Sequence, residues 1–380
     1  MDEPLIEAVD ACIGENACTA VRVFFGTNRA VDPAEPIERL NVTGEDAALF
    51  TQVESETGLM LGSVSISVPC LEGEVTTAER GCRRRFADIP RPQPTPVFSR
   101  LFPRKLDPYQ HFVFFSIEGL SRDGFADAVG EAEEAFVFVH GFNVSFKRAA
   151  MTAAQLKVDS QFPGEAFIFS WPTREGRYID SRRAAETART QFREYIEFVA
   201  DSSGVERVHV IAHSMGNYLI MPVLADLARE RAAEEPLFGE LIFAAPDISA
   251  NAFAEYAEQI DGLGRGLTLY ASANDLAMRA SIQMCRFNQE EEFCERRAGD
   301  VGPAGPVTLP FVDTIDVSAL DGDFFAAGLF DDFGHGYFNE DRNLIQDIGV
   351  LISSGVRPPA RRNPTLRRID AESGAFWRFP

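Results

Sequence analysis

A serine stands where a strand gives way to a helix, in the stretch AHSMGN at residues 212–217. Residues 207–212 form an apolar, β-rich run, and the residues after the stretch have a helical pattern. A sharp turn here lifts the hydroxyl of Ser214 out of the sheet and places a helix N-terminus beneath it. The N–H groups and dipole of that terminus favour developing negative charge. The pattern predicts that Ser214 is a nucleophile.

A second apolar strand, residues 135–140, ends in His140-Gly141, and Phe142 supplies the next N–H group. The turn at Ser214 resembles the nucleophile elbow G-x-S-x-G of the α/β hydrolases, with alanine in the first glycine position, and the His-Gly strand end resembles their oxyanion loop. The resemblance implies that the N–H groups of Phe142 and Met215 form the oxyanion hole. Each such donor is worth on the order of 10²–10³ in kcat.

In that superfamily the chain order is Ser, then acid, then His. Only His335 follows Ser214 among the five histidines, and glycines flank it. We therefore expect His335 to be the base. Asp275 follows the strand at 267–272 and is the expected acid, and Asp247, at the end of the preceding strand, is the alternative. A buried carboxylate would fix the imidazole tautomer and stabilise the imidazolium.

Softer motifs extend the resemblance to a bacterial esterase/lipase-like α/β hydrolase family of unassigned physiological role. They are FGTNR near residue 25, VHGFNVSF, FSWP at 169–172, AAPD at 244–247 and GHGYF. Thr27-Asn28-Arg29 would tie the first strand to a neighbouring loop. Trp171, at the carboxyl end of a strand where α/β folds bind ligands, is a candidate for lining the pocket.

The elements that must position these residues alternate along the chain. Strands are predicted at 21–25, 64–68, 111–117, 135–140, 166–170, 207–212, 240–245, 267–272 and 314–318. Helical patterns at 145–160, 182–201 and 338–353 lie between or after them. Near-continuous apolar strands alternating with helices predict an α/β fold with a mostly parallel central sheet, helices on both faces and antiparallel strands at the N-terminal edge. The resemblance described above implies that this is the α/β-hydrolase fold.

We expect three regions along the chain. Residues 1–19 lack clear periodicity and are interpreted as an extension, residues 20–356 as one hydrolase domain, and residues 357–380 as a tail draped on the surface or solvated. Loop insertions are expected at about 71–108 and 276–313.

The composition is that of a globular protein with a strongly acidic surface. Of 380 residues, 45% are hydrophobic and 25% charged, and the net charge is −22. Such a charge disfavours nucleic acid and anionic membranes as partners. No apolar run could span a bilayer. Asp316, Asp321 and Asp323 lack EF-hand spacing, so we expect no metal there.

Six cysteines fall into three local pairs in polar stretches. The pairs are Cys12/Cys18, Cys70/Cys82 and Cys285/Cys294. They are disulfide candidates, which favours an exported protein in the periplasm or outside the cell. The chain as given starts without a signal sequence, so export would require one upstream of residue 1. Six reduced thiols in a cytoplasmic protein are the alternative.

The residues predict hydrolysis of a small-molecule carboxylic ester through a Ser–His–Asp triad and an acyl-enzyme, without cofactor or metal. Amidase, thioesterase or peptidase activity would use the same parts. A binding protein with an inert hydrolase-like pocket is a second class, and its sign would be a lost triad residue. The sequence leaves the oligomeric state open.

Overall fold

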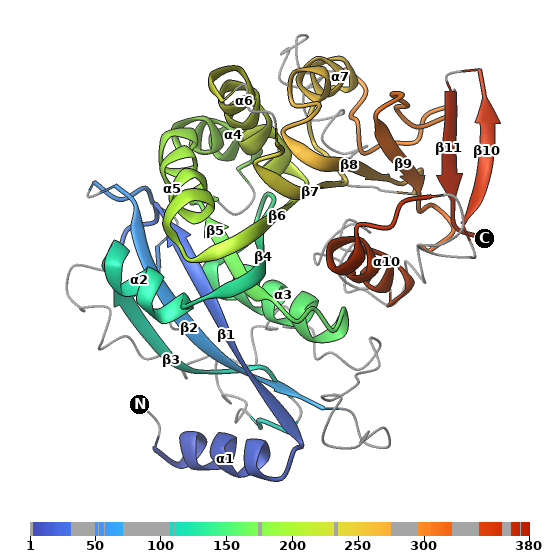
Figure 1. Ribbon diagram of the computed structural model, residues 1–380. Coiled ribbons are helices and arrows are strands. Elements are labelled where there is room, and N and C mark those ends of the chain that lie inside the picture. Colours follow the sequence, from blue (N-terminus) through green and yellow to red (C-terminus); the bar gives the residue numbers. More distant parts are fainter. Residues whose placement is uncertain are drawn as a thin grey trace.

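The structure is a computed structural model. It describes residues 3–31, 50–51, 53–56, 58–70, 107–109, 111–173, 177–231, 235–274, 295–303, 305–320, 342–358, 366–372 and 374–380. Within these residues, eleven strands form one sheet (Figure 1). The strands are β1 (Cys18–Thr27), β2 (Met60–Pro69), β3 (Val113–Leu120), β4 (Ala132–Val139), β5 (Glu165–Ser170), β6 (Val205–His213), β7 (Phe238–Ala244), β8 (Gly264–Ala271), β9 (Val312–Asp316), β10 (Arg367–Ala371) and β11 (Gly374–Arg378).

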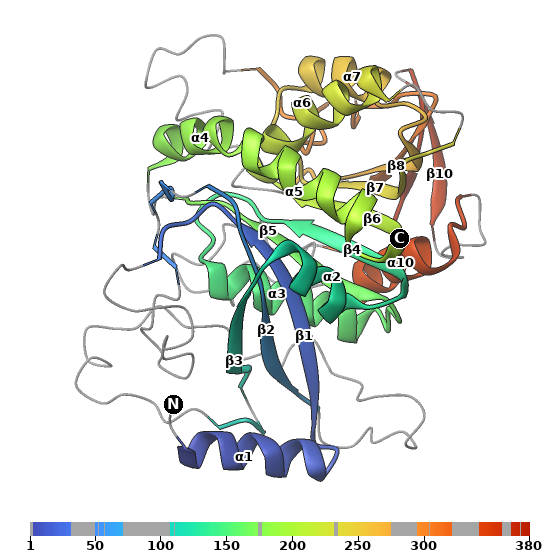
Figure 2. The same cartoon turned by 60° about the vertical axis from the view of Figure 1, so that its left-hand side comes forward.

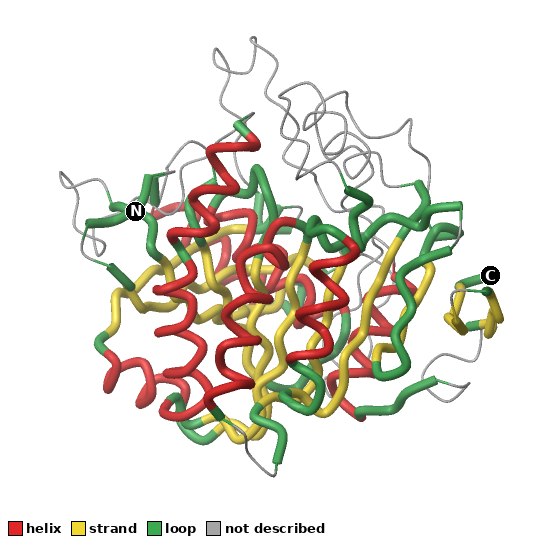
Figure 3. Tube along the Cα trace, turned by 90° about the horizontal axis from the view of Figure 1, so that it is seen from above, coloured by secondary structure: helices red, strands yellow, loops and turns green. Residues whose placement is uncertain are grey.

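The helices lie on both sides of this sheet. They are α1 (Glu3–Gly14), α2 (Arg122–Val129), α3 (Phe146–Asp159), α4 (Tyr178–Thr187), α5 (Arg189–Ser202), α6 (Met215–Glu230), α7 (Ala250–Gln259) and α10 (Arg342–Ser354). Helices α4 to α7 cover one face, and α3 and α10 cover the other (Figure 2). The view from above shows helices lying over one face of the strands (Figure 3).

The sheet is mostly parallel, as predicted. Its order is β10-β11-β9-β8-β7-β6-β4-β5-β1-β2-β3. The ladder from β1 through β5, β4, β6, β7 and β8 to β9 is parallel, and β2 and β3 add antiparallel strands beyond β1. The predicted antiparallel N-terminal edge is therefore confirmed.

The strand order places the two candidate catalytic loops side by side. Strands β4 and β6 are parallel neighbours, with Val139 opposite Ala212. The chain goes from β4 outward to β5 and then crosses back over β4 to β6. Such a reversal opens a crevice at the carboxyl ends of the strands, where open α/β sheets bind ligands. The His140-Gly141 loop and the Ser214 turn both start at that edge.

Apolar side chains alternate between two cores, one on each face of the sheet. On β4, Val137 and Val139 pack toward the helices α4 to α7, whereas Phe136 and Phe138 pack toward α3 and α10. Both sets are almost fully buried. A central parallel strand buried on both faces reads as a continuous apolar run, which is why residues 135–139 could be predicted as a strand.

All nine predicted strands are present as β1 to β9, and the predicted helices near 145–160 and 338–353 are α3 and α10. The stretch 182–201 was expected to be one helix. It forms two helices, α4 and α5, which meet at Ala188. No glycine or proline marks this break, so the local sequence gives no sign of it.

The first residues, expected to be an irregular extension, form helix α1. Leu5, Val9 and Cys12 are buried at helical spacing, and Leu5 and Val9 pack with Val113 of β3. One short apolar stripe on a single face is enough to dock a helix, although it is too short to give a clear periodic signal. The helix lies across one end of strands β1 to β3 (Figure 1).

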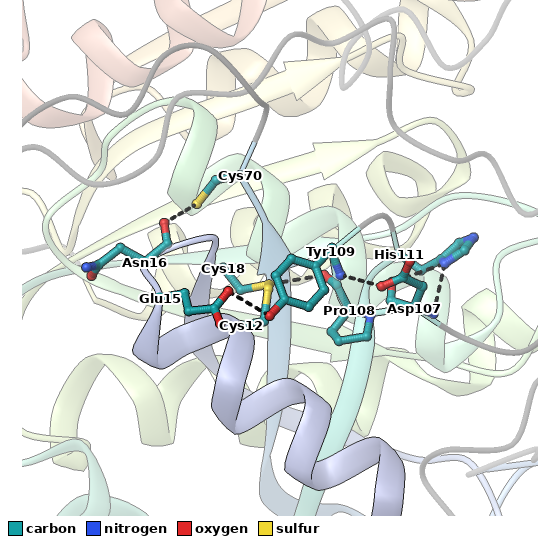
Figure 4. The surroundings of a disulfide bond; sticks show 9 residues. All are labelled: Cys12, Glu15, Asn16, Cys18, Cys70, Asp107, Pro108, Tyr109 and His111. Atoms are coloured by element: carbon teal, nitrogen blue, oxygen red, sulfur yellow. Dashed lines mark hydrogen bonds between the residues drawn. A yellow bond between two sulfur atoms is a disulfide. The ribbon is translucent and has the colours of Figure 1, made fainter.

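A disulfide joins α1 to β1, as predicted for the first cysteine pair. Cys12 and Cys18 are bonded, with their Cα atoms 5.3 Å apart (Figure 4). Cys70 is also disulfide-bonded. Its predicted partner Cys82 lies outside the described residues, as does the whole pair Cys285 and Cys294. Nearby, the hydroxyl of Tyr109 donates a hydrogen bond to Glu15 at 2.9 Å.

The C-terminal tail, expected to be draped on the surface or solvated, joins the sheet. Strands β10 and β11 form a hairpin, and β11 pairs in parallel with β9 through Trp377 opposite Ile315 and Arg378 opposite Asp316. The guanidinium of Arg378 also pairs with the buried carboxylate of Asp316 at 2.7 Å. That ion pair, which no local pattern of charged residues predicts, helps to fix β11 beside β9.

Candidate active site

Ser214 occupies a strained turn between β6 and α6. Its φ of 54° and ψ of −125° lie in a region that L-residues rarely adopt. The side chain makes no capping hydrogen bond to helix α6, and the Ser214 N–H donates to the carbonyl of Ala244 at 3.0 Å. The predicted sequence of strand, sharp turn and helix is therefore confirmed.

Glycines allow the close packing that this turn needs. A Cβ on Gly141 would lie 2.6 Å from the Cβ of Ser214 and 3.2 Å from its Oγ. A Cβ on Gly216 would lie 2.6 Å from the carbonyl oxygen of Val139. The loop after β4 therefore contacts the serine directly, and the start of α6 rests on the end of β4.

Two peptide units carry the predicted oxyanion donors, and each is held through its carbonyl. The Ser214 carbonyl, in the same peptide as the Met215 N–H, accepts hydrogen bonds from the Asn217 N–H and Nδ2, both at 3.0 Å. The Gly141 carbonyl, in the same peptide as the Phe142 N–H, accepts a hydrogen bond from His140 Nδ1 at 2.9 Å. In a planar trans peptide the N–H points opposite to the C=O, so fixing the carbonyl also fixes the direction of the N–H.

The protonation state of His140 follows from its partners. Its Nε2 lies 3.2 Å from the Trp171 N–H and 3.3 Å from Arg29 Nη2, and both groups can only donate. Nε2 therefore carries no proton, and Nδ1 is the nitrogen that donates to Gly141. Burial and, secondarily, the charge of Arg29 lower the pKa of His140 to about 3. The imidazole stays neutral and holds one tautomer.

Arg29 links three strand ends in the buried region behind this loop. Its Nε donates to Ser170 Oγ at 2.9 Å and its Nη2 donates to the Val144 carbonyl at 2.8 Å. Thr27 Oγ1 donates to the Ser170 carbonyl at 2.6 Å. Burial lowers the pKa of Arg29 to about 9. The expected role of Thr27-Asn28-Arg29 in tying the first strand to a neighbouring loop is confirmed for Thr27 and Arg29.

Trp171 follows β5 and packs against the same histidine. Its ring is fully buried, stacks on His140 with ring centroids 5.4 Å apart, and donates through Nε1 to the His140 carbonyl at 2.9 Å. These contacts support the loop that carries Phe142. That Trp171 lines the substrate pocket stays a prediction.

The predicted base and acid, His335 and Asp275, lie outside the described residues. The elements on either side of them are in contact, because Tyr270 of β8 donates its hydroxyl to Asp347 of α10 at 2.6 Å in the buried interior. The strand that leads toward Asp275 is thereby fixed to the helix that follows His335.

The alternative acid, Asp247, is buried after β7. Its carboxylate contacts Arg297 at 3.0 Å and Tyr178 at 2.7 Å. Neither Tyr178 nor Arg297 was found from the sequence. Arg297 lies within the expected insertion at 276–313, and no local pattern connects it to a residue 50 positions earlier.

No group of three or more His, Cys, Asp or Glu side chains that could hold a metal ion occurs in the described part of the chain. Asp316, considered above as a calcium candidate, pairs with Arg378 and accepts a hydrogen bond from Ser318 N–H at 3.0 Å. None of the described helices is long and apolar enough to cross a membrane.

Residues 123–291 match a protein-family model described as "Alpha/beta hydrolase of unknown function (DUF900)". That segment contains the Ser214 turn, the His140-Gly141 loop and the strands β4 to β8. No curated protein sequence matches the chain.

Among solved structures, the chain is similar to an esterase from Pyrobaculum calidifontis, with 14% identity over 60% of this chain and 78% of that one and a TM-score of 0.33. It is also similar to EstE1, a thermostable carboxylesterase cloned from a metagenomic library, with 15% identity over 62% of this chain and 83% of that one and a TM-score of 0.34. The esterase LipW from Mycobacterium marinum has 11% identity over 94% of this chain and 88% of that one, with a TM-score of 0.33.

Proposed function

Because the chain has an α/β-hydrolase fold and residues 123–291 match an α/β-hydrolase family model, we propose that it cleaves a carboxylic ester with Ser214 as the nucleophile. The observation that carries this proposal is the strained backbone of Ser214, at φ 54°, in direct contact with Gly141. A serine held in such a strained conformation, beside a loop whose Gly141–Phe142 peptide is fixed by His140, is typical of an acyl-transfer site.

In the proposed reaction, Ser214 Oγ attacks the ester carbonyl while His335 takes its proton. Asp275 orients His335 and stabilises the imidazolium. The N–H groups of Phe142 and Met215 stabilise the oxyanion of the tetrahedral intermediate. The alcohol leaves with the proton from His335, and water then hydrolyses the acyl-enzyme by the same steps in reverse order.

The electrostatics of the described residues support this mechanism. His140 stays neutral with a pKa of about 3, so it holds the Gly141 carbonyl at any working pH. Its fixed tautomer aims the N–H of Phe142 before substrate arrives. Such preorganisation is what makes oxyanion donors effective, because no reorientation is needed during the reaction.

A panel of chromogenic esters with graded acyl length, assayed with wild type and Ser214→Ala, tests the proposal. We expect turnover of at least one ester, and a loss of about 10⁴-fold or more in Ser214→Ala. Ser354→Ala, an exposed serine at the end of α10, is the matched control and should retain full activity. Near-normal turnover by Ser214→Ala would contradict the proposal.

The same panel separates the alternatives. Matched amides and thioesters of the preferred acyl group would identify an amidase, peptidase or thioesterase if their kcat/KM exceeded that of the ester. Binding of the ester without turnover in wild type would indicate a non-catalytic binding protein.

We further propose that the protein works in an oxidising compartment, the periplasm or the cell exterior. The Cys12–Cys18 disulfide supports this location, since such bonds persist where thiols are not kept reduced.

A further inference from the structure

The carboxylate of Asp247 is the centre of a buried cluster that we call the Asp247 cluster: Asp247, Tyr178 and Arg297. Oδ1 pairs with Arg297 Nε at 3.0 Å, with the side chains only 3% and 1% exposed. Oδ2 accepts a hydrogen bond from the Tyr178 hydroxyl at 2.7 Å. Three separate segments supply these residues: the end of β7, the start of α4 and residues 295–303.

The backbone holds Arg297 in place against the end of β7. The N–H of Ala298 donates to Ile248 at 2.9 Å and that of Gly299 donates to Pro246 at 3.0 Å. A Cβ on Gly299 would lie 2.6 Å from the carbonyl carbon of Ala245, so the two segments touch through their backbones. These backbone contacts therefore fix the position of Arg297 relative to Asp247.

The cluster reaches the first oxyanion donor through the main chain. The Asp247 N–H donates to the Ser214 carbonyl at 3.1 Å. That carbonyl shares a planar peptide with the Met215 N–H, so the bond from Asp247 helps to aim Met215 in the opposite direction. Anchoring the Asp247 side chain on both oxygens fixes the N–H that makes this bond.

The cluster reaches the second donor through an aromatic contact. The ring of Tyr178 packs edge-on against that of Phe142, with centroids 5.6 Å apart. Burial and then the charge of Asp247 raise the pKa of Tyr178, so its hydroxyl stays protonated and remains a donor to Asp247. The position of the Phe142 ring therefore depends on the same carboxylate as the direction of the Met215 N–H.

The geometry points to the Asp247 cluster as a positioning device that aligns both oxyanion donors, with Asp247 acting through Ser214 and Tyr178 rather than as the triad acid. This inference rests on the proposed ester hydrolysis. It assigns a role to residues 295–303, which lie within the expected insertion at 276–313, because Arg297 supplies the cation that neutralises Asp247. Misalignment of the donors should lower kcat and leave KM nearly unchanged, since the oxyanion forms only after Ser214 has attacked and is absent from the bound, unreacted ester.

Tyr178→Phe is the most informative variant, because it removes one hydroxyl and keeps the ring against Phe142. We expect kcat to fall by about 10- to 100-fold with KM unchanged within about twofold, as for a small misplacement at a reacting centre. The affinity for a trifluoromethyl ketone, which forms an oxyanion on Ser214, should fall by the same factor. Active sites are counted by fluorophosphonate titration, so loss of folded protein does not enter kcat.

Tyr109→Phe is the matched control. It also removes a tyrosine hydroxyl that donates to a carboxylate, that of Glu15, but at the exposed surface beside α1. Its kcat and its inhibitor affinity should equal those of wild type.

Asp247→Asn and Asp275→Asn separate positioning from the triad. We expect Asp275→Asn to cost about 10⁴ in kcat, as loss of a triad acid does. Asp247→Asn should cost about 10²-fold and leave the pH profile of kcat in place. A cost near 10⁴ with a shifted profile for Asp247→Asn, or wild-type kcat in Tyr178→Phe, would overturn the inference. Absence of ester turnover in the wild type would instead overturn the proposed function and the inference with it.

Discussion

At the scale of single residues, backbone strain gathers at one edge of the sheet. Of the five non-glycine residues with positive φ in the described part of the chain, three follow strands β4, β6 and β7: Asn143 (58°), Ser214 (54°) and Ala245 (45°). The other two, Asn16 and Gln161, follow helices α1 and α3. A non-glycine residue held in such a conformation costs about 1–3 kcal/mol, and the surrounding structure must over-determine it. Three such residues at the carboxyl ends of neighbouring strands support the proposal that the active site lies at this edge of the sheet.

The strain at Ser214 leads to a prediction about stability. Ser214→Gly should unfold with a free energy about 1 kcal/mol higher than Ser214→Ala, because glycine adopts a positive φ without a steric penalty. Both variants should be inactive, so the serine costs stability in exchange for function. Urea unfolding of the two variants measures the difference. Equal stability, or a more stable alanine variant, would show that the turn is not strained.

Candidate site residues that directly follow a strand could be predicted from the sequence. Residues that come together only when distant segments pack could not. Ser214 and Phe142 each follow an apolar strand directly, so a short window of residues contains the signal. Tyr178 and Arg297 contact Asp247 only after three distant segments have packed together. Their residue types are common, and only the fold brings them to one carboxylate.

At the scale of elements, the fit between β4 and α6 controls the site. A Cβ on Gly216 would lie 2.6 Å from the Val139 carbonyl oxygen and 2.8 Å from the His140 carbonyl oxygen. Both are backbone atoms of the central sheet and its adjoining loop, so they cannot rotate away as a flexible side chain can. The start of the helix must therefore touch the strand end.

Gly216→Ala should push the start of α6 away from β4. We expect a loss of about 1–3 kcal/mol in the free energy of unfolding, as for other overpacked sites, together with a loss of ester turnover. Gly14→Ala is the control, because a Cβ at Gly14 meets nothing within 4 Å. Urea unfolding and turnover per titrated site give the two readouts. A Gly216→Ala protein as stable and active as the control would contradict this packing.

The strands that the sequence predicted include the buried central ones, whose apolar runs are continuous, and the edge strand β3, whose side chains alternate in burial. The hairpin of β10 and β11 was not predicted, because tertiary contacts hold it in place and its sequence has no apolar alternation typical of a strand. Of β10, four residues are exposed. The hairpin is fixed by two paired positions on β9 and by the ion pair of Arg378 with Asp316. Helix α1 was not predicted either, because its apolar stripe is only two turns long and gives a weak periodic signal.

At the scale of the whole molecule, buried histidines make stability depend on pH. Burial, and then the charges of Arg207 and Arg265, lower the pKa of His209 to about 3. Its Nδ1 accepts the N–H of Glu240 at 2.9 Å, a bond that needs the unprotonated nitrogen. In the unfolded chain this histidine binds a proton below about pH 6.5, whereas in the folded chain it does not until about pH 3.

The contribution of His209 to stability is therefore complete above about pH 6.5 and is lost as the pH falls toward 3, at about 1.4 kcal/mol per pH unit. His209→Gln keeps an acceptor but does not titrate. Urea unfolding at about pH 7.5 and about pH 5.5 should show a smaller loss of stability in the variant than in wild type. An equal loss in both proteins would mean that His209 does not stay neutral in the fold.

The disulfides offer a second test for the whole molecule. Alkylation without reduction should leave Cys12 and Cys18 unmodified in protein made in an oxidising compartment, and alkylation after reduction should modify both. Peptide mass measurement reports each cysteine separately, so the predicted pairs Cys70/Cys82 and Cys285/Cys294 are tested together. The short Cys12–Cys18 loop should add less than about 3 kcal/mol of stability. Alkylation of Cys12 in the unreduced protein would contradict the bond and the proposed location.

Trapping the nucleophile tests the central claim most directly. Wild-type protein is treated with a fluorophosphonate, digested, and mapped by peptide mass, with Ser214→Ala treated in parallel. The proposed mechanism predicts one adduct per molecule, on the peptide that contains Ser214, and no adduct in the variant. An unlabelled wild-type protein, or an adduct on another residue that persists in Ser214→Ala, would contradict the claim that Ser214 is the catalytic nucleophile.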